Sequence, residues 1–162
     1  GSMNFYRDLP ISCVSIGLFK EEKPIIGVVY DFNNDDMYTS VADNISKLND
    51  KPICVSNTSK VQDAILCTGF PVNMDFSRNK LMKFVEDVID YKKVRLLGSA
   101  ALSLACVACG KVDVYAESDI MLWDVAAGLA LVVGAGGYID ITPGTHRWSY
   151  NVYASNNKIN SN

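Results

Sequence analysis

Three carboxylates gather around the start of one apolar stretch in this 162-residue chain. In "AESDIMLWDVAAGLALVVGAGGYID", Glu117 and Asp119 fall in the expected strand-to-helix loop, and Asp124 begins a helix that is apolar almost all round and is therefore expected to be buried. A single carboxylate at its start would be an ordinary N-cap. Three crowded carboxylates instead repel one another unless a cation or a solvated cleft relieves them, and hard oxygen ligands of this kind suit Mg²⁺.

A second helix start lies upstream, in "RLLGSAAL". Here a short strand runs through Gly98 and Ser99 directly into a helix, which leaves backbone N–H groups and the positive end of the helix dipole to face a polar or anionic ligand. An ordinary Gly-Ser capped turn is the alternative. One of these two helix starts carries an acidic residue and the other does not. Together they fit a metal-assisted phosphate site at one edge of a sheet.

Other chemistry-bearing residues are interpreted as structural. Cys106 and Cys109 form one C-x-x-C inside the apolar run "LSLACVACG", so they are expected to be small core residues on a helix rather than a zinc or redox pair. His146 is the only histidine, and a serine hydrolase would depend on it alone. The stretch "DFNNDD" opens like a calcium loop, but Asp36 and Ala42 stand where that loop needs Gly and Glu, so a solvated hairpin turn is expected.

The composition indicates one globular domain, with 49% hydrophobic and 20% charged residues. A net charge of −3 without a basic stripe argues against nucleic acid as a partner. No run reaches the roughly 18 apolar residues that span a bilayer, and the N-terminus lacks a signal-peptide layout, so no membrane partner is expected. Five cysteines, an odd number, favour free thiols, and a cytoplasmic location is expected.

The order of strands and helices indicates a layered α/β fold, an α+β sandwich. Residues 1–60 are predicted to form an antiparallel meander, and residues 61–158 to alternate strands and helices, with 159–162 as a frayed tail that continues the polar stretch "NNKINSN". The meander strands are "ISCVSIGLF", "PIIGVVYDF", "DMYTSV" and a short one in "KPICVS". The later strands are "AILCTG", "VRLL", "VDVYA", "YIDI" and "NVYAS".

The helices of the second half are predicted in "SRNKLMKFVEDVIDY", "SAALSLACVAC" and "DVAAGLALVVGA". In the first of them, the spacing places Leu81, Phe84, Val85 and Val88 on one apolar face, with Ser77 as the N-cap. The other two are apolar enough to lie in the core.

These motifs resemble a known family. The stretch "WDVAAGLALVVGAGG" closely resembles the signature W-D-x-A-A-G…A-G-G of the inositol monophosphatase family, and "RLLGSAALSLACVACGKVDVYAE" resembles the segment that precedes it there. The opening "GSMNF" matches the second half of the family motif D-P-x-D-G-[ST]-x-N-F, with Gly1, Ser2, Asn4 and Phe5 in register. The resemblance runs from residue 1 to about residue 158 and implies the C-terminal part of the inositol monophosphatase fold. One departure is Gly134, where most members have Glu.

The resemblance implies a Mg²⁺-dependent, lithium-sensitive phosphatase for inositol monophosphate or a related sugar phosphate. Asp124 matches a Mg²⁺ ligand of the catalytic centre, and the Ser2 hydroxyl matches the group that orients the attacking water. The backbone N–H groups of Gly1 and Ser2 match those that hold the phosphate, and Glu117 matches the acid that binds substrate hydroxyls. The residues matching the sugar side of the pocket are Gly98, Ser99 and Ala100.

The resemblance also implies what this chain does not contain. The family's other Mg²⁺ ligands, a Glu on an earlier segment and the two Asp residues of D-P-x-D, and its general-base Glu have no counterpart, so the isolated chain is expected to be inactive. An apolar patch on the meander is expected to be exposed, and to be buried by the missing segment or by self-association, as in a homodimer. Alternatives are a non-catalytic module that binds a phosphorylated ligand or acts as a subunit, and a relative that hydrolyses bisphosphorylated nucleotides or fructose bisphosphate.

Overall fold

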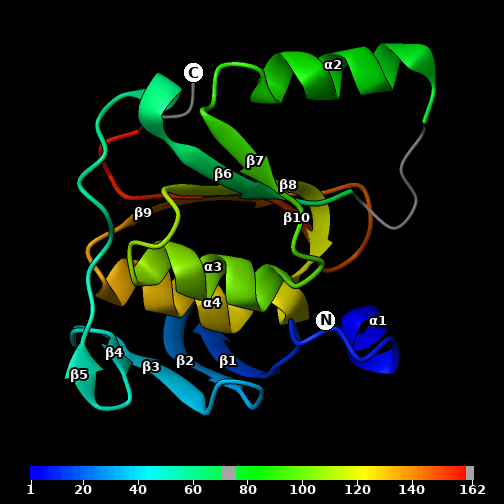
Figure 1. Cartoon of the computed structure of the whole chain (residues 1–162). Coiled ribbons are helices and arrows are strands. Elements are labelled where there is room, and N and C mark those ends of the chain that lie inside the picture. Colours follow the sequence, from blue (N-terminus) through cyan, green and yellow to red (C-terminus); the bar gives the residue numbers. More distant parts are fainter. Residues whose placement is uncertain (71–75, 160–162) are drawn as a thin grey trace.

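The computed structural model describes residues 1–70 and 76–159 and arranges them in layers (Figure 1). Two five-stranded sheets enclose the helices α3 (Ala100–Ala108) and α4 (Leu122–Gly134). A further helix, α2 (Arg78–Val88), lies on the far side of the second sheet. This arrangement confirms the expected layered fold, a strand meander followed by alternating strands and helices.

The first sheet, sheet A, is the predicted antiparallel meander, in the order β1-β2-β3-β4-β5. Its strands are β1 (Val14–Lys20), β2 (Lys23–Asp31), β3 (Asp36–Val41), β4 (Lys47–Leu48) and β5 (Lys51–Pro52). The turn between β2 and β3 is closed by its own side chains, because the Asp31 carboxylate accepts hydrogen bonds from the Asn33 backbone N–H (3.0 Å) and the Asn34 side-chain amide (2.8 Å). This is the solvated turn that was expected in place of a calcium loop.

The second sheet, sheet B, has the order β7-β6-β8-β10-β9. Its strands are β6 (Ile65–Thr68), β7 (Lys93–Arg95), β8 (Val114–Met121), β9 (Tyr138–Pro143) and β10 (Ser149–Ser155). Strands β7, β6 and β8 are parallel, and β10 pairs antiparallel with β8 and β9. Two short elements complete the chain, the helix α1 (Ser2–Tyr6) and the 3-10 turn η1 (Val61–Asp63).

Helix α4 is the centre of the core. Its residues from 125 to 132 are all buried, as expected from a helix that is apolar almost all round. It packs against sheet A, against α3 and against the strands of sheet B. Among the described residues, no helix is both long enough and apolar enough to cross a membrane.

Glycines allow α4 to approach its neighbours closely. Gly17 and Gly27 are paired across β1 and β2 and face α4. A Cβ atom on Gly17 would lie 2.7 Å from the Ala126 Cβ, and one on Gly27 would overlap the Ala127 carbonyl oxygen. On the α3 side, a Cβ atom on Gly128 would overlap a leucine of that helix. The helix therefore touches sheet A and α3 through backbone and small side chains.

The C-terminal end of α4 accepts hydrogen bonds from β3 and from the loop between β3 and β4. The Ser40 hydroxyl donates to the Ala130 carbonyl (2.9 Å) and the Ser46 hydroxyl donates to the Leu131 carbonyl (2.8 Å), which satisfies carbonyls of the last turns. A Cβ atom on Gly134 would collide with both hydroxyls. The departure from the family pattern at Gly134 thus concerns packing at the end of α4 remote from Asp124.

The outer face of sheet A carries the exposed apolar patch that was expected. Val14, Ile16 and Leu18 alternate along β1 and are 50%, 62% and 51% exposed, and Val41 of β3 is 50% exposed. Their strand partners place these side chains on the face of the sheet that is turned away from α4.

Helix α2 forms as predicted, but its apolar residues do not share one buried face. Phe84 is 4.7 Å from the Phe70 ring, and Val88 packs against the small apolar cluster of sheet B. Leu81 and Val85 are exposed instead. The four residues fall within about 100° of the helix circumference, but only the edge that carries Phe84 and Val88 contacts the domain, and Leu81 and Val85 lie outside that contact.

The chain remains packed beyond β10. Ile159 is buried in the small cluster of sheet B, and the Asn156 side-chain amide donates to the Ser56 hydroxyl and the Thr58 carbonyl, both at 2.8 Å. The fraying expected from Asn156 onward therefore does not include Asn156 or Ile159, because their polar and apolar groups both find partners. Residues 160–162 lie outside the described residues.

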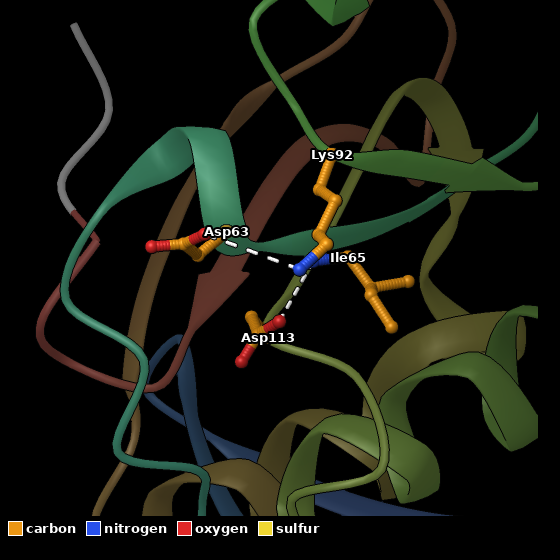
Figure 2. Close-up of polar contacts among 4 residues, drawn as sticks. All are labelled: Asp63, Ile65, Lys92 and Asp113. Carbon is orange, nitrogen blue, oxygen red and sulfur yellow. Dashed lines mark hydrogen bonds and ion pairs between the residues drawn. The ribbon is translucent and has the colours of Figure 1, made fainter.

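The same corner anchors the start of β6 (Figure 2). The Asp113 carboxylate accepts a hydrogen bond from the Ile65 backbone N–H at 2.7 Å, and the Lys92 ammonium lies 4.0 Å from the Asp63 carboxylate. Asp113 also accepts a hydrogen bond from the Ser56 hydroxyl, and that hydroxyl in turn accepts one from the Asn156 side-chain amide. The buried carboxylate of Asp113, the residue before β8, thus connects the start of β8 to the start of β6.

The close approach at Gly27 generates a stability prediction. We expect Gly27→Ala to lower the free energy of unfolding by about 3 kcal/mol, because the added methyl group overlaps backbone rather than a movable side chain. Thr39→Ala, on the opposite face of the neighbouring strand, should change it by less than about 1 kcal/mol. Urea denaturation followed by circular dichroism measures both. Equal values for the two variants would contradict the role of Gly27.

Candidate functional site

Glu117 lies within β8 and is held by its neighbours. The Tyr115 hydroxyl donates a hydrogen bond to Glu117 Oε2 at 2.9 Å. Burial raises the pKa of Glu117, the hydrogen bond from Tyr115 lowers it, and the charge of Asp124 raises it again. The net direction is upward from the usual value of 4.5, so the ionised form of Glu117 is disfavoured in the folded protein.

Asp124 lies in the first turn of α4. The helix begins earlier than predicted, at Leu122 with Met121 as its N-cap, because β8 runs into α4 without a loop. Asp124 is therefore not the cap, although its carboxylate is still near the positive end of the helix dipole. The side chain is solvent-accessible at the mouth of the site. Partial desolvation by the surrounding protein raises the pKa of Asp124, and the nearby amino group of Gly1 lowers it by a smaller amount.

Asp119 does not join the other two carboxylates, which corrects the expected cluster of three. It occupies a bulge of β8, with a φ of 55°, and its backbone N–H donates to the Asn151 side chain. Its carboxylate accepts hydrogen bonds from Thr145 Oγ1 (2.7 Å) and Ser149 Oγ (2.9 Å). These hydrogen bonds lower the pKa of Asp119, and those from Thr145 have the largest effect. The bulge turns Asp119 toward the β9–β10 loop and away from α4.

The second predicted helix start is present at α3. Ser99 is its buried N-cap residue, and Gly98 before it has a φ of 68°, which a glycine adopts without strain. The Ser99 carbonyl accepts bonds from the backbone and the hydroxyl of Ser103, at 3.0 and 2.9 Å. Ala100 follows as the first residue of α3 and is half-buried.

Gly1 and Ser2 begin α1 and are exposed. Asn4 fastens this segment to the turn before α3, because its side-chain amide donates to the Leu97 carbonyl (2.8 Å) and the Ile11 carbonyl (2.9 Å). A Cβ atom on Gly98 would lie 3.1 Å from the same amide. The "GSMNF" motif thus places α1 beside the ends of α3 and α4 (Figure 1).

The structure therefore brings together the start of α1, the start of α3, the Glu117 carboxylate and the Asp124 carboxylate. One electrostatic coupling connects the two carboxylates, because the charge of Asp124 raises the pKa of Glu117. The segments come from four separate elements of the sequence. Asp119 lines the same cleft as Glu117, but its carboxylate is bonded to Thr145 and Ser149.

Sequence reasoning missed the residues that position Glu117. A Cβ atom on Gly69 would lie 2.5 Å from Glu117 Oε2, so a side chain at this position would displace the carboxylate from where it lies. Glu117 also lines a cleft of about 790 Å³ between sheet B and α2, together with Thr68 and Lys83. The period-2 pattern of β8 places Tyr115 and Glu117 on one face of the strand, and that signal could have pointed to their contact.

Two rejected chemistries remain unsupported by the geometry of the described residues. The single proton of the Ser149 hydroxyl has the Asp119 carboxylate (2.9 Å) and the His146 backbone carbonyl (3.0 Å) as its acceptors, rather than an imidazole. Cys106 and Cys109 are half-buried, and burial raises the pKa of both thiols, that of Cys106 to about 11. Both thiols are therefore protonated core groups, as expected.

The residues present do not make a complete site for the implied Mg²⁺. Asp124 offers one carboxylate, and residues 1–70 and 76–159 contain no group of three or more His, Cys, Asp or Glu side chains that could hold a metal ion. Divalent cations of this kind are bound by several oxygen ligands. A single carboxylate beside Glu117 is at most part of such a site.

Comparisons with known proteins agree on one family. The model of the inositol monophosphatase family matches residues 1–161. An inositol-1-monophosphatase from Synechocystis is 38% identical over 140 residues, which are 86% of this chain and 49% of that protein. The Nus factor SuhB of Xylella fastidiosa is 37% identical over 140 residues, 86% of this chain and 51% of that protein.

The solved structure of an inositol monophosphatase from Anabaena has the same fold. It superimposes with a TM-score of 0.85 at 35% identity, over 98% of this chain and 64% of that one. The chain thus spans about half the length of the curated relatives it matches.

The raised pKa of Glu117 generates a pH-dependent prediction. A carboxyl group whose pKa is raised on folding loses stabilisation as the pH increases through that pKa. Glu117→Gln keeps an acceptor for the Tyr115 hydroxyl without the charge. We therefore expect this variant to be more stable than the parent at neutral pH, with the difference shrinking as the pH falls toward 4.5.

Asp119→Asn is the matched control with the opposite sign. The pKa of Asp119 is lowered on folding, so its contribution is present above its usual value of 3.8 and is lost as the pH falls below it. This variant should be less stable than the parent at neutral pH. Urea midpoints measured from pH 3 to 8 test both variants, and a Glu117→Gln variant that is less stable at every pH would contradict the assignment.

Proposed function

The chain belongs to the inositol monophosphatase family, and from this premise we propose that the full protein hydrolyses a small phosphate monoester, either inositol monophosphate or a related sugar phosphate. The observation that carries the proposal is the pairing of Glu117 with Asp124 beside the starts of α1 and α3. Two coupled carboxylates at the mouth of a site favour cations and hydroxyl donors, which relieve their mutual repulsion.

Glu117 is proposed to recognise the alcohol part of the substrate. Burial disfavours its charge, so hydroxyl groups that donate to it replace the hydration it has lost. Tyr115 holds the carboxylate through a hydrogen bond, Gly69 leaves the space that it occupies, and a polyol would present more than one hydroxyl to it. This chemistry supports a cyclitol or sugar over an aromatic or apolar alcohol.

The phosphate end is proposed to lie at α1 and Asp124. The backbone N–H groups of Gly1 and Ser2 are at the first turn of α1, where they can donate to phosphate oxygens, and the Ser2 hydroxyl can orient a water. Gly98, Ser99 and Ala100 border the substrate between these groups and Glu117. Asp124 is proposed as one ligand of a catalytic cation, which we take to be Mg²⁺.

We propose that residues 1–162 alone do not hydrolyse phosphate esters. The cation needs carboxylates in addition to Asp124, and the described residues do not provide them. Hydrolysis is therefore proposed to depend on a segment that corresponds to the part of the related proteins' sequences, about half, that this chain does not match. Lithium sensitivity would follow from the same cation site. Free thiols at all five cysteines support a cytoplasmic location.

A non-catalytic role is the second candidate. It is favoured by the incomplete set of metal ligands and by the similarity to a protein named Nus factor SuhB. Binding of inositol 1-phosphate without turnover, measured by calorimetry on the isolated chain, would support it. The family relatives that act on bisphosphorylated substrates are distinguished by assaying fructose 1,6-bisphosphate and adenosine 3′,5′-bisphosphate beside inositol 1-phosphate.

The test of the phosphatase proposal is Mg²⁺-dependent phosphate release from inositol 1-phosphate. We expect no release from residues 1–162, and release from a chimera in which the part of the Synechocystis enzyme that precedes the match is joined to Gly1. In the chimera, Asp124→Asn should reduce kcat/KM by at least about a hundredfold, because it removes a metal ligand. Glu117→Gln should mainly raise KM, and Asp119→Asn should change neither constant.

Two outcomes would overturn parts of this proposal. Release from the isolated chain that disappears in Asp124→Asn would show that the site is complete within these residues. A folded chimera that binds inositol 1-phosphate but releases no phosphate would favour the non-catalytic role.

A further inference from the structure

The α1 segment is attached to the domain without a core of its own. None of its residues from Ser2 to Tyr6 is buried. Two side chains of the segment reach other parts of the chain: the Phe5 ring meets the Phe32 ring edge-on at 5.9 Å, and Asn4 forms hydrogen bonds. The placement of α1 therefore depends on a few contacts rather than on burial.

The Asn4 side chain uses both of its N–H donors on two separate segments. It donates to the Leu97 carbonyl at 2.8 Å and to the Ile11 carbonyl at 2.9 Å. Leu97 and Ile11 both pack against the main core, so their carbonyls are held in place. An uncharged amide of this length can serve two acceptors at once, whereas a hydroxyl has one proton to donate.

These two hydrogen bonds connect two sides of the proposed substrate pocket. The Ile11 carbonyl lies beside Gly1, where a Cβ atom would approach it to 2.7 Å. Leu97 precedes Gly98, where a Cβ atom would lie 3.1 Å from Asn4 Nδ2. One side chain thus fixes the distance between the segment proposed to hold the phosphate and the segment proposed to border the alcohol.

We propose that Asn4 is a positioning residue of the active site, which sets the spacing between Gly1 and Ser2 on the phosphate side and Gly98 on the alcohol side. This inference rests on the proposed phosphatase function. It adds a residue to which no contact with substrate or cation is assigned. Because a displacement of about 1 Å at a reacting centre can lower a rate about a hundredfold, loss of the Asn4 amide should affect turnover more than substrate binding.

Trypsin cleavage after Arg7, the residue that follows α1, measures the attachment of α1 in residues 1–162 without any substrate. Asn4→Ala removes both hydrogen bonds, so cleavage there should be at least about tenfold faster than in the parent. Asn33→Ala is the matched control, because the Asn33 amide also donates to a backbone carbonyl, that of Ser12 at 3.1 Å, but lies outside α1. It should leave cleavage at Arg7 unchanged, and circular dichroism verifies that each variant is folded.

The chimera with the N-terminal part of the Synechocystis enzyme tests the effect on catalysis. With inositol 1-phosphate, Asn4→Ala should reduce kcat by at least about tenfold and change KM and the Mg²⁺ dependence by less than about twofold. Asn4→Asp should be more damaging, because a carboxylate of the same shape cannot donate and would face two carbonyl oxygens. Asn33→Ala should keep the constants of the parent chimera.

A double-mutant cycle with Gly98→Ala separates positioning from a general loss of stability. The methyl group added in Gly98→Ala would press on the Asn4 amide, so this variant should also lower kcat. Removing the amide leaves room for that methyl group. The double variant should therefore lose less activity than the product of the two single effects.

Four results would each overturn the positioning role: unchanged cleavage at Arg7 in Asn4→Ala, an unchanged kcat in that variant, an equal loss in Asn33→Ala, or fully multiplicative effects in the cycle. An inactive parent chimera would contradict the proposed function instead. Cleavage at Arg7 would then decide whether Asn4 fastens α1.

Discussion

The position of helix α4 is the constraint on which the rest of the structure depends. It is packed between two sheets and α3, and its close contact with sheet A is possible only because Gly17 and Gly27 present no side chains. A protein interior transmits small displacements because it is close-packed. Since Asp124 is in the first turn of α4 and Glu117 is in the strand that leads into it, the packing of this helix sets the relation between the two carboxylates.

The carboxylate pair is retained at the expense of stability. Burial and mutual repulsion disfavour the charge on Glu117, yet Tyr115 is placed to donate to it and Gly69 is kept free of a side chain beside it. Glu117 is only partly buried and lines a cleft, so a ligand there can reach its carboxylate. Strain of this kind, supported by surrounding residues, is typical of a site where a ligand supplies the missing interactions.

Much of the fold could be predicted because it depends on local patterns. The meander follows from β-branched strands and polar turns, and α3 and α4 follow from continuous apolar stretches. The proximity of Asp124 to Glu117 was also expected from their short separation in the sequence, although a loop was predicted where β8 leads directly into α4. What failed depended on details that the pattern does not contain. The bulge at Asp119 turns a carboxylate away, and contacts such as Asn4 with Leu97 join residues far apart in the sequence.

Helix α2 shows why amphipathicity alone does not identify a partner. Its spacing predicted one buried face, and the helix instead divides its apolar residues between the cleft and the solvent. The first turn of α2 has no acidic residue and its last turn has no basic one, so the helix depends for its stability on the contacts of Phe84 and Val88 rather than on charges that complement its dipole.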